Sequence, residues 1–285
     1  MAQVSSRPVA LTVAGFDPSG GAGILADLKT FAAHDCYGVA AIAAMTAQNT
    51  REVRNVMPVD PEMLRLQLDM LFEDISIAGI KVGLLGGRKN LEIVAACLSA
   101  HKELPIVVDP VLRSTSGTQF LPPQDIEPFK RLLFPLVHVL TPNAEEAGRL
   151  LGAPVSTLEE MKGAAKLLHE QGVRHVVITG GHLDKPTDVY YGGQEIEVFT
   201  GHRIESQSTH GTGCTFSSAI LTNLIHGKAA MESVVLAKAY VTQAINRAYP
   251  IGNGRGPLNH LFRFGEPTAP VRVGGPDPTH DSSHQ

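Results

Sequence analysis

The stretch PVALTVAGFDPSGGAGILADLKTF occupies residues 8–31 and joins an apolar run, a glycine-rich turn and an amphipathic segment. The run at 8–15 is short, apolar and stopped by glycine, which is typical of a buried strand. The segment 22–35 carries apolar residues at helical spacing, namely Ile24, Leu25, Leu28 and Phe31. A second apolar run at 38–50 turns polar at its end. We therefore predict a strand, a loop, a helix and a second strand.

The same alternation continues along the chain. Further strands are predicted at 78–85, 105–110, 138–142 and 174–181. Helices are predicted at 60–74, 89–102, 124–133, 143–151 and 158–171. The first of these has a clear start, because Asp60 can cap it and Pro61 suits the first helical position. Strands that alternate with helices indicate an α/β fold, a mostly parallel sheet covered on both faces.

The last third of the chain departs from this rhythm. Residues 188–199 indicate a hairpin around Gly192 and Gly193, and helices are predicted from about 212 to 227 and from about 230 to 248. The tail at 265–285 is rich in Pro, Gly, Ser and His, so we expect it to be disordered. No linker is visible, and we predict one domain over residues 1–264.

Composition limits the function classes. The 285 residues are 43% hydrophobic and 18% charged with a net charge of −4, and no basic stripe is present, which argues against a nucleic-acid partner. Cys36, Cys97 and Cys214 are few, odd in number and far apart, as in a reducing cytoplasm. No signal peptide and no membrane-spanning stretch is expected. A small anionic substrate would have to be held by local features.

The heptapeptide THGTGCT at 209–215 is the first such feature. Gly-Thr-Gly before an apolar helix exposes backbone N–H groups at a helix N-terminus, where they bind anions. The alternative is a simple helix start with Thr209 or Thr212 as the N-cap and Cys214 as core filling. The heptapeptide alone does not separate the two.

The glycine-rich segment 15–27 invites two other interpretations. Residues 21–26 fit G-x-G-x-x-G/A, but the glycines do not follow the strand directly and no acidic residue stands where a dinucleotide ribose needs one. A P-loop fails because no Gly-Lys-Ser/Thr closes the segment. A substrate-embracing loop remains, beside a glycine-rich turn that binds nothing.

Polar residues follow several predicted strands, where parallel sheets bind ligands. They include Asp17, Gln48, Asn49, Asp109, Asn143 and Glu146. Asp109 at a strand end suits a metal-water or proton-transfer role. Asn143 and Glu146 lie three residues apart and could organise Mg²⁺ through water. The same spacing is also that of a capping box, which needs no metal.

Four segments together resemble the hydroxymethylpyrimidine/phosphomethylpyrimidine kinases of the ribokinase superfamily. They are AGFDPSGGAGILADLKTF, TAQNT, LTPNAEEA and THGTGCTFSSAI, and the resemblance runs from about residue 9 to about residue 260. It implies a three-layer α/β/α ribokinase-like fold and ATP-dependent phosphorylation of 4-amino-5-hydroxymethyl-2-methylpyrimidine. The monophosphate is then phosphorylated to the diphosphate used for thiamine diphosphate.

The resemblance also implies roles for single residues. Substrate-binding positions are Gln48, Asp27, Gly15 and Ala22, with Asp27 expected at the exocyclic amine of the ring. The anion hole for the transferring phosphoryl group is expected at Gly211, Thr212 and Gly213. Nucleotide-binding positions are Asn143, Thr179 and Asp188, and positions for Mg²⁺ are Asp109 and Glu146. The cofactors would be ATP and Mg²⁺, and a homodimer is expected.

Two features of this sequence qualify that picture. Related sugar kinases carry an aspartate base where this chain has Cys214, and we expect the helix N-terminus to lower the thiol pKa enough for a thiolate near neutral pH. A lysine often precedes the pair Gly180–Gly181 in the family, whereas this chain has Thr179.

Three other activities stay open at this point. Pyridoxal kinase is the nearest, since both substrates carry a hydroxymethyl arm on a flat heterocycle. A nicotinamide-dependent oxidoreductase built on Gly21 and Gly23 is more distant, as is a non-catalytic ligand sensor.

Overall fold

A single sheet runs through the whole molecule. The computed structural model describes residues 7–113, 117–181 and 185–265, and these contain nine strands in the order β3-β2-β1-β4-β5-β6-β7-β8-β9. The strands are β1 (Val9–Phe16), β2 (Tyr37–Gln48), β3 (Val53–Pro58), β4 (Ile77–Val82), β5 (Ile106–Val108), β6 (Val139–Leu140), β7 (His175–Gly180), β8 (Thr187–Tyr191) and β9 (Ile196–Thr200). From β2 to β7 all neighbours are parallel, while β3, β8 and β9 are added antiparallel at the edges.

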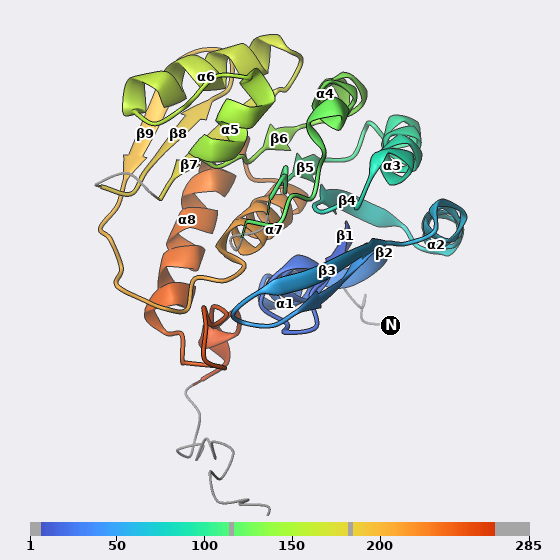
Figure 1. Cartoon of the computed structure of the whole chain (residues 1–285), viewed down its shortest axis with the longest axis horizontal. Helices are drawn as coiled ribbons and strands as arrows, with labels where there is room; N and C mark the ends of the chain where they lie inside the picture. Colours follow the sequence, from blue (N-terminus) through green and yellow to red (C-terminus); the bar gives the residue numbers. More distant parts are fainter. Residues whose placement is uncertain (1–6, 114–116, 182–184, 266–285) are drawn as a thin grey trace, which may run out of the picture.

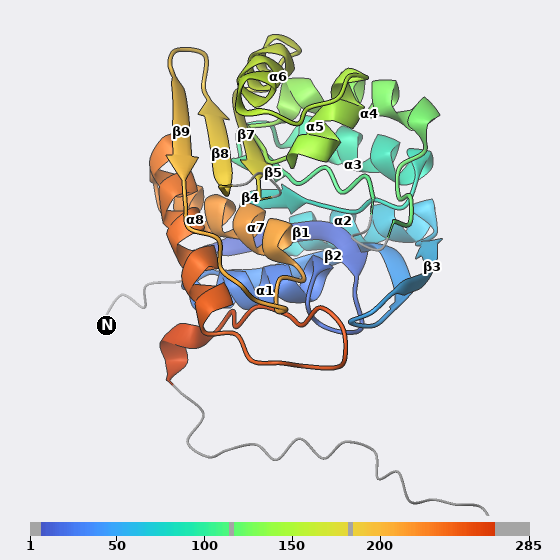
Figure 2. The same cartoon turned by 60° about the vertical axis from the view of Figure 1, so that its left-hand side comes forward.

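Helices cover both faces of this sheet. They are α1 (Gly23–Ala33), α2 (Pro61–Asp74), α3 (Arg88–Ala100), α4 (Ile126–Leu133), α5 (Ala144–Leu151), α6 (Leu158–Glu170), α7 (Thr212–Ile225) and α8 (Ala230–Asn246). The helices α1, α7 and α8 lie together against one face, and α2 to α6 line the other (Figures 1 and 2). The predicted three-layer α/β/α fold with a mostly parallel sheet is confirmed.

The core is divided in two by the sheet. In β1 the side chains of Leu11 and Val13 join the apolar cluster beneath α2 to α6, and Ala10 joins the cluster beneath α1, α7 and α8. Strands buried on both sides read as continuous apolar runs rather than alternating ones. This explains why these strands stood out so clearly in the sequence.

Local sequence signals predicted several helices and strands correctly. Asp60 Oδ1 accepts hydrogen bonds from the backbone N–H groups of Glu62 and Met63 at 3.1 and 3.2 Å, and Pro61 opens α2, as expected. The predicted hairpin is confirmed as β8 and β9, which form one edge of the sheet in Figure 2. The opposite edge strand β3 was not predicted, because it is short, half exposed and ends in proline.

The carboxyl ends of the parallel strands meet at one edge, where the loops after β1, β5 and β6 and the start of α7 come together. Of the tail at 265–285, only Gly265 belongs to the described residues. The disorder predicted for the tail stays a prediction. In the described part of the chain, no helix has the length and apolarity needed to cross a membrane.

Candidate active site

Two glycine-rich loops, far apart in the sequence, are packed backbone against backbone at this edge. Gly211 has φ +82°, and a Cβ there would lie 1.8 Å from the carbonyl oxygen of Gly21. Gly23 has φ +55°, and a Cβ there would lie 2.2 Å from the carbonyl oxygen of Gly15. Only glycine combines a left-handed backbone with such close approach. The loop after β1 and the loop before α7 therefore form one wall of the site.

The segment 211–215 contains the first turn of α7, and the backbone N–H of Thr212 donates to the carbonyl oxygen of Thr209 at 3.4 Å. Gly211 is the N-cap and no side chain caps the helix, so the expected alternative of a threonine N-cap is wrong. Thr212 Oγ1 instead donates to the carbonyl oxygen of Thr209 at 2.7 Å. The backbone N–H of Thr215 donates to the oxygen of Gly211 at 2.9 Å, and the amides of Gly213 and Cys214 lie ahead of that bond. A helix N-terminus of this kind suits an anion.

Cys214 lies at the bottom of this wall as a neutral thiol. The carboxylate of Asp109 and the backbone N–H of Gly23 both lie near this thiol and influence its pKa. Burial raises the pKa of the Cys214 thiol to about 12, helped by the charges of Asp109 and Asp27 and opposed by Lys81. The expected thiolate near neutral pH is therefore wrong for the free protein, because desolvation outweighs the helix N-terminus.

Asp27 lies beneath the site rather than in it. Its carboxylate is completely buried and pairs with the equally buried ammonium group of Lys81 at 3.0 Å. Thr12 Oγ1 and Ser218 Oγ donate to the same carboxylate at 2.6 and 2.7 Å. With both oxygens engaged and no exposed surface, Asp27 does not reach a substrate, and the expected contact with the exocyclic amine is corrected.

Two further carboxyl groups lie at this edge of the sheet, and Asp109 is the one near the thiol. Asp109 follows β5, Glu146 lies in the first turn of α5, and both are buried. Burial raises the pKa of each carboxyl group above its ordinary value, and the charge of Asp109 adds to the effect on Glu146. Asn143 and Glu146 form the capping box: each backbone N–H donates to the other side chain at 2.9 Å. The box accounts for the spacing of Asn143 and Glu146. The raised pKa values of Asp109 and Glu146 come mainly from burial, and a divalent cation would stabilise the ionised form of both groups.

The expected nucleotide residues lie side by side on the ends of β6, β7 and β8. Thr179 is bridged to Asn143 on one side and registered with Asp188 on the other. Asp188 Oδ1 accepts the backbone N–H of Gly180 at 3.2 Å, and its other oxygen accepts from the ammonium group of Lys238 on α8. Lys238 was not singled out in the sequence, because one lysine on a helix carries no motif.

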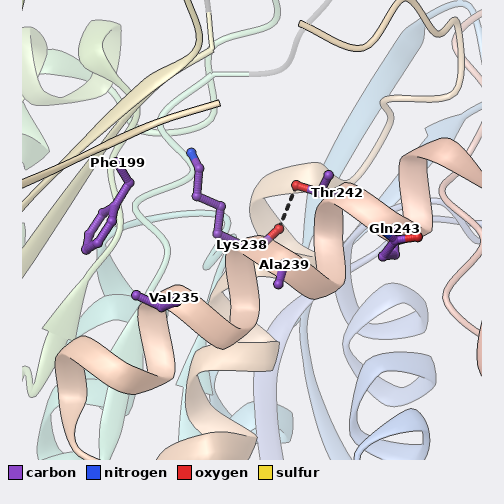
Figure 3. A pocket seen from close by; sticks show the side chains of 6 residues that line it. All are labelled: Phe199, Val235, Lys238, Ala239, Thr242 and Gln243. Atoms are coloured by element: carbon purple, nitrogen blue, oxygen red, sulfur yellow. Dashed lines mark hydrogen bonds between the residues drawn. The ribbon is translucent and has the colours of Figure 1, made fainter. Parts of the chain in front are cut away.

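Lys238 also lines an open groove of about 380 Å³ between α8 and β9. Figure 3 shows the ring of Phe199 above Val235 of α8, with the side chain of Lys238 rising beside it. Thr242 Oγ1 donates to the carbonyl oxygen of Lys238 at 2.8 Å and belongs to the same wall. The groove joins an apolar floor to a charged end beside Asp188.

Gln48 comes from the end of β2 and is partly exposed at the opposite end of the site. Its carboxamide nitrogen lies 3.0 Å from Nε2 of His210, which lies 2.7 Å from Oδ2 of Asp17. Asp17 also accepts from Ser19 Oγ at 2.7 Å and from the backbone N–H of Ala22 at 2.9 Å. Burial alone would raise the pKa of Asp17, but the hydrogen bonds from His210 and Ser19 hold it below its ordinary value.

This cluster is what sequence reasoning missed. Asp17 was noticed only as a polar residue after a predicted strand, and His210 only as part of the heptapeptide at 209–215. The two residues are 193 positions apart in the chain. Gly15 is buried against Leu84, and Ala22 is the N-cap of α1, so both shape the loop rather than present a side chain. The sequence does contain a signal for the pair of Asp17 and His210, because each residue adjoins a loop that requires glycine.

Among residues 7–113, 117–181 and 185–265, no group of three or more His, Cys, Asp or Glu side chains is arranged to hold a metal ion. Asp109 and Glu146 are two carboxylates, which is fewer than a cage made by protein alone. Mg²⁺ commonly uses one or two carboxylates together with water and substrate phosphates. The pair therefore fits a cation that arrives with a nucleotide.

Comparison with known proteins gives this geometry its family. A sequence model described as phosphomethylpyrimidine kinase matches residues 17–259. The chain belongs to the phosphomethylpyrimidine kinase family. A hydroxymethylpyrimidine/phosphomethylpyrimidine kinase of Aquifex aeolicus is 39% identical over 248 residues, which is 86% of this chain and 97% of that protein. Family membership argues against the oxidoreductase interpretation of Gly21 and Gly23.

Two further relatives are similar to this chain over most of its length. The thiamine biosynthesis bifunctional protein ThiED of Geobacter sulfurreducens is 43% identical over 90% of this chain, which spans 53% of that longer protein. The crystal structure of an ADP complex of Bacillus subtilis pyridoxal kinase superposes with a TM-score of 0.83 at 36% identity, covering 91% of this chain and all of that one. The chain is thus a small-molecule kinase of ribokinase-like fold.

Proposed function

We propose that this kinase phosphorylates 4-amino-5-hydroxymethyl-2-methylpyrimidine with ATP, and then phosphorylates the monophosphate to the diphosphate. One observation carries the proposal: the loop that presents the Gly213 and Cys214 amides is packed directly on the loop beside Gln48. A ring held at Gln48 therefore lies next to a site for a transferring phosphoryl group. The named relatives with full-length matches support the same reaction.

The substrate side is chemically suited to an aminopyrimidine. A carboxamide offers both a hydrogen-bond donor and an acceptor, which matches the ring edge that carries a nitrogen and an amino group. Gln48 is the partly exposed carboxamide at this end of the site, and we assign the ring to it. Gly15 and Ala22 contribute backbone that lets the ring approach closely.

The phosphate side relies on fixed dipoles and on two carboxylates. The amides of residues 211–214 would receive the γ-phosphoryl group, where preorganised donors stabilise the charge of a loose transition state. Asp109 and Glu146 would hold Mg²⁺ through water, which supplies charge neutralisation for the nucleotide phosphates. Their raised pKa values would fall when a divalent cation shares their charge.

We place the nucleotide along the ends of β6 to β8. The groove beside Phe199 and Val235 would take the base, and its charged end would adjoin the phosphates. Thr179 provides no cation there, whereas the ammonium group of Lys238 lies across the strand end, paired with Asp188. The solved relative with bound ADP supports a nucleotide on this fold.

Cys214 would meet the attacking hydroxymethyl oxygen as a neutral thiol. In a loose transition state the hydroxyl proton would leave late, to an oxygen of the phosphoryl group being transferred, so orientation of the attacking oxygen matters more than a preformed base. The second phosphorylation is attacked by a phosphate oxygen that is already ionised. We therefore expect Cys214 to matter for the first transfer more than for the second.

Pyridoxal phosphorylation is the second candidate. The observation that favours it is the structural similarity to the Bacillus subtilis pyridoxal kinase, at a TM-score of 0.83 over 91% of this chain. Both substrates carry a hydroxymethyl arm on a flat ring. The ratio of kcat/KM for the two substrates decides between them, and a value in favour of the pyrimidine supports the main proposal.

An ATP-consumption assay with hydroxymethylpyrimidine tests the main proposal directly. We expect wild-type turnover, and for Gln48→Ala a KM for the pyrimidine raised by about 10-fold or more, because one oriented hydrogen bond is lost. Asn49→Ala is a matched control: its side chain accepts from the backbone N–H groups of Arg51 and Glu52 at 2.8 and 3.1 Å. It should change KM little. Absence of wild-type turnover would overturn the proposal.

The predicted homodimer stays a prediction. Sedimentation equilibrium of the full chain measures it, and a monomer across the working concentration range would contradict it.

A further inference from the structure

The ring of His210 joins three separate parts of the site through one nitrogen. His210 immediately precedes the N-cap of α7, Asp17 follows β1 and Gln48 ends β2. Nε2 of His210 lies 2.7 Å from Asp17 Oδ2 and 3.0 Å from the amide nitrogen of Gln48. Both distances are within hydrogen-bond range, so Nε2 faces two partners at once.

One imidazole nitrogen cannot donate to one neighbour and accept from another. Asp17 is an ionised acceptor at neutral pH, since hydrogen bonds from His210 and Ser19 hold its pKa below the ordinary value. An ionised carboxylate 2.7 Å away requires a proton on Nε2. This holds for the neutral ring protonated at Nε2 and equally for the imidazolium ion.

The proton on Nε2 determines which end of the Gln48 carboxamide faces the ring. A half-turn about the last side-chain bond exchanges the amide oxygen and nitrogen in place. With the oxygen toward His210, the N–H of Nε2 is shared between Asp17 and Gln48 in a three-centre bond. The NH₂ group then faces Thr46 Oγ1, which lies 3.3 Å from that end of the amide.

Thr46 is free to accept this bond. Its hydroxyl proton is already donated to the carbonyl oxygen of Phe16 at 3.0 Å, so its lone pairs are the groups available to Gln48. One N–H of the carboxamide is satisfied by Thr46, and the second remains for the site. Every donor of the cluster except this second N–H then has an acceptor, whereas the opposite orientation sets the Gln48 NH₂ group against the protonated Nε2 of His210.

The ring itself has little room to turn. A Cβ at Gly21 would lie 2.3 Å from Cδ2 of His210, so the backbone of the first glycine loop presses against the imidazole edge. Side chains locked by packing and by further hydrogen bonds are the ones that hold a binding group in place.

We propose that His210 is a positioning residue that fixes the Gln48 carboxamide with its NH₂ as donor toward the substrate, so that the site selects a flat ring offering a hydrogen-bond acceptor there. The assignment of the ring to Gln48 rests on the proposed function. The orientation of the carboxamide rests on the hydrogen bonds of the free protein alone.

Kinetics with hydroxymethylpyrimidine test the positioning role. His210→Leu should raise the KM for the pyrimidine about 10-fold, the loss of one oriented hydrogen bond, with kcat changed less than about 3-fold. His210→Gln should restore most of the KM, because its amide N–H reaches about as far as Nε2. In a Gln48→Ala background, His210→Leu should have little further effect.

Ser19→Ala is the matched control. It removes one donor from Oδ1 of Asp17 and leaves the Oδ2–His210 contact in place, so KM should stay within about 2-fold. A fall in kcat at unchanged KM for His210→Leu, or effects of His210→Leu and Gln48→Ala that multiply, would overturn the positioning role.

Nitrogen NMR of the histidine-labelled free protein gives a readout that needs no substrate. The proposal requires a proton on Nε2 of His210, identified by the loss of that signal in His210→Gln. A lone pair on Nε2 overturns the proposal even if His210→Leu does not fold. A protonated Nε2 together with no wild-type turnover would overturn the proposed function and leave the orientation of Gln48 supported.

Discussion

Two aspartates, ten positions apart, show how differently this fold uses the same side chain. Asp17 lies in a loop, holds His210 at 2.7 Å and through it reaches Gln48. Asp27 lies on α1, is completely buried and holds Lys81 at 3.0 Å. The first shapes the surface that meets a ligand, and the second ties α1, β1, β4 and α7 together beneath it. The difference is one of backbone position, since the side chains are identical.

Removal of the buried Asp27 carboxylate should have the largest effect on stability. Asp27→Ala leaves the Lys81 ammonium group buried without a partner, and should lower the free energy of unfolding by about 3–5 kcal/mol. Urea denaturation measures it. The double variant Asp27→Ala, Lys81→Met should recover a large part of the loss. Arg88→Ala, which breaks an exposed pair with Glu92, should cost less than about 1 kcal/mol. An equal cost for Asp27→Ala and Arg88→Ala would contradict the structural role.

The Cys214 thiol lies near Asp27 and Asp109, whose charges raise its pKa. Cys214→Ala should slow the first phosphorylation by about 100-fold and the second by less than about 5-fold, because the thiol orients the neutral alcohol of the first step, whereas the second step is attacked by an ionised phosphate oxygen. Separate assays with the pyrimidine and its monophosphate measure both. Equal losses would point to a role of Cys214 in loop geometry.

The raised thiol pKa gives the same residue an independent test. With its pKa near 12, Cys214 should react slowly with iodoacetamide at neutral pH and gain reactivity only toward strongly alkaline pH. Peptide mapping after timed labelling follows it. A reactive Cys214 at pH 7 in the free protein would restore the thiolate that the sequence suggested.

Compared with Asp27→Ala, Asp17→Ala should cost less stability and should weaken substrate binding more. Four donors lose a buried acceptor, so the free energy of unfolding should fall by about 1–2 kcal/mol. The KM for the pyrimidine should rise several-fold because His210 no longer holds Gln48. Paired unfolding and kinetic measurements give the ratio of the two effects, and a stability loss as large as that of Asp27→Ala would end the distinction.

The smallest expected effect is on acid stability. The pKa of Asp17 is lowered on folding, so its contribution is present above the unfolded pKa of about 4 and is lost as the pH falls through the folded value. Wild type and Asp17→Asn should therefore differ most near neutral pH and converge below pH of about 4. Unfolding curves at several pH values measure this, and a gap that widens in acid would contradict the sign.

The fold was largely predictable, and the reason is visible in β1. Strands buried on both faces produce apolar runs, and caps such as Asp60 mark helix starts, so local signals and fold agree. The edge strand β3 was missed because exposure on an edge removes the apolar pattern. The loop before α7 stood out in the sequence because glycine at 211 has a local backbone cause, a left-handed conformation in close contact with Gly21.

The site was less predictable where its residues act through distant partners. Asp27 was expected at the substrate, yet helical geometry turns it toward Lys81, and the sequence contains no mark of that pairing. The thiol pKa was misjudged for a similar reason, because the helix N-terminus is a local feature and the desolvation of Cys214 depends on the whole fold. The predicted roles of Gln48, Asn143 and Thr179 stay predictions.

The contact between Gly211 and Gly21 has a mechanical consequence. With only 1.8 Å from a Cβ position at 211 to the oxygen of residue 21, any side chain there would wedge the two loops apart. The loop on the substrate side and the loop on the phosphate side would then no longer be held at a fixed separation. The distance between the attacking oxygen and the phosphorus atom would vary. Since misplacement by about 1 Å can cost about 100-fold in rate, the absence of a Cβ at position 211 limits how far the reacting groups can be displaced from each other.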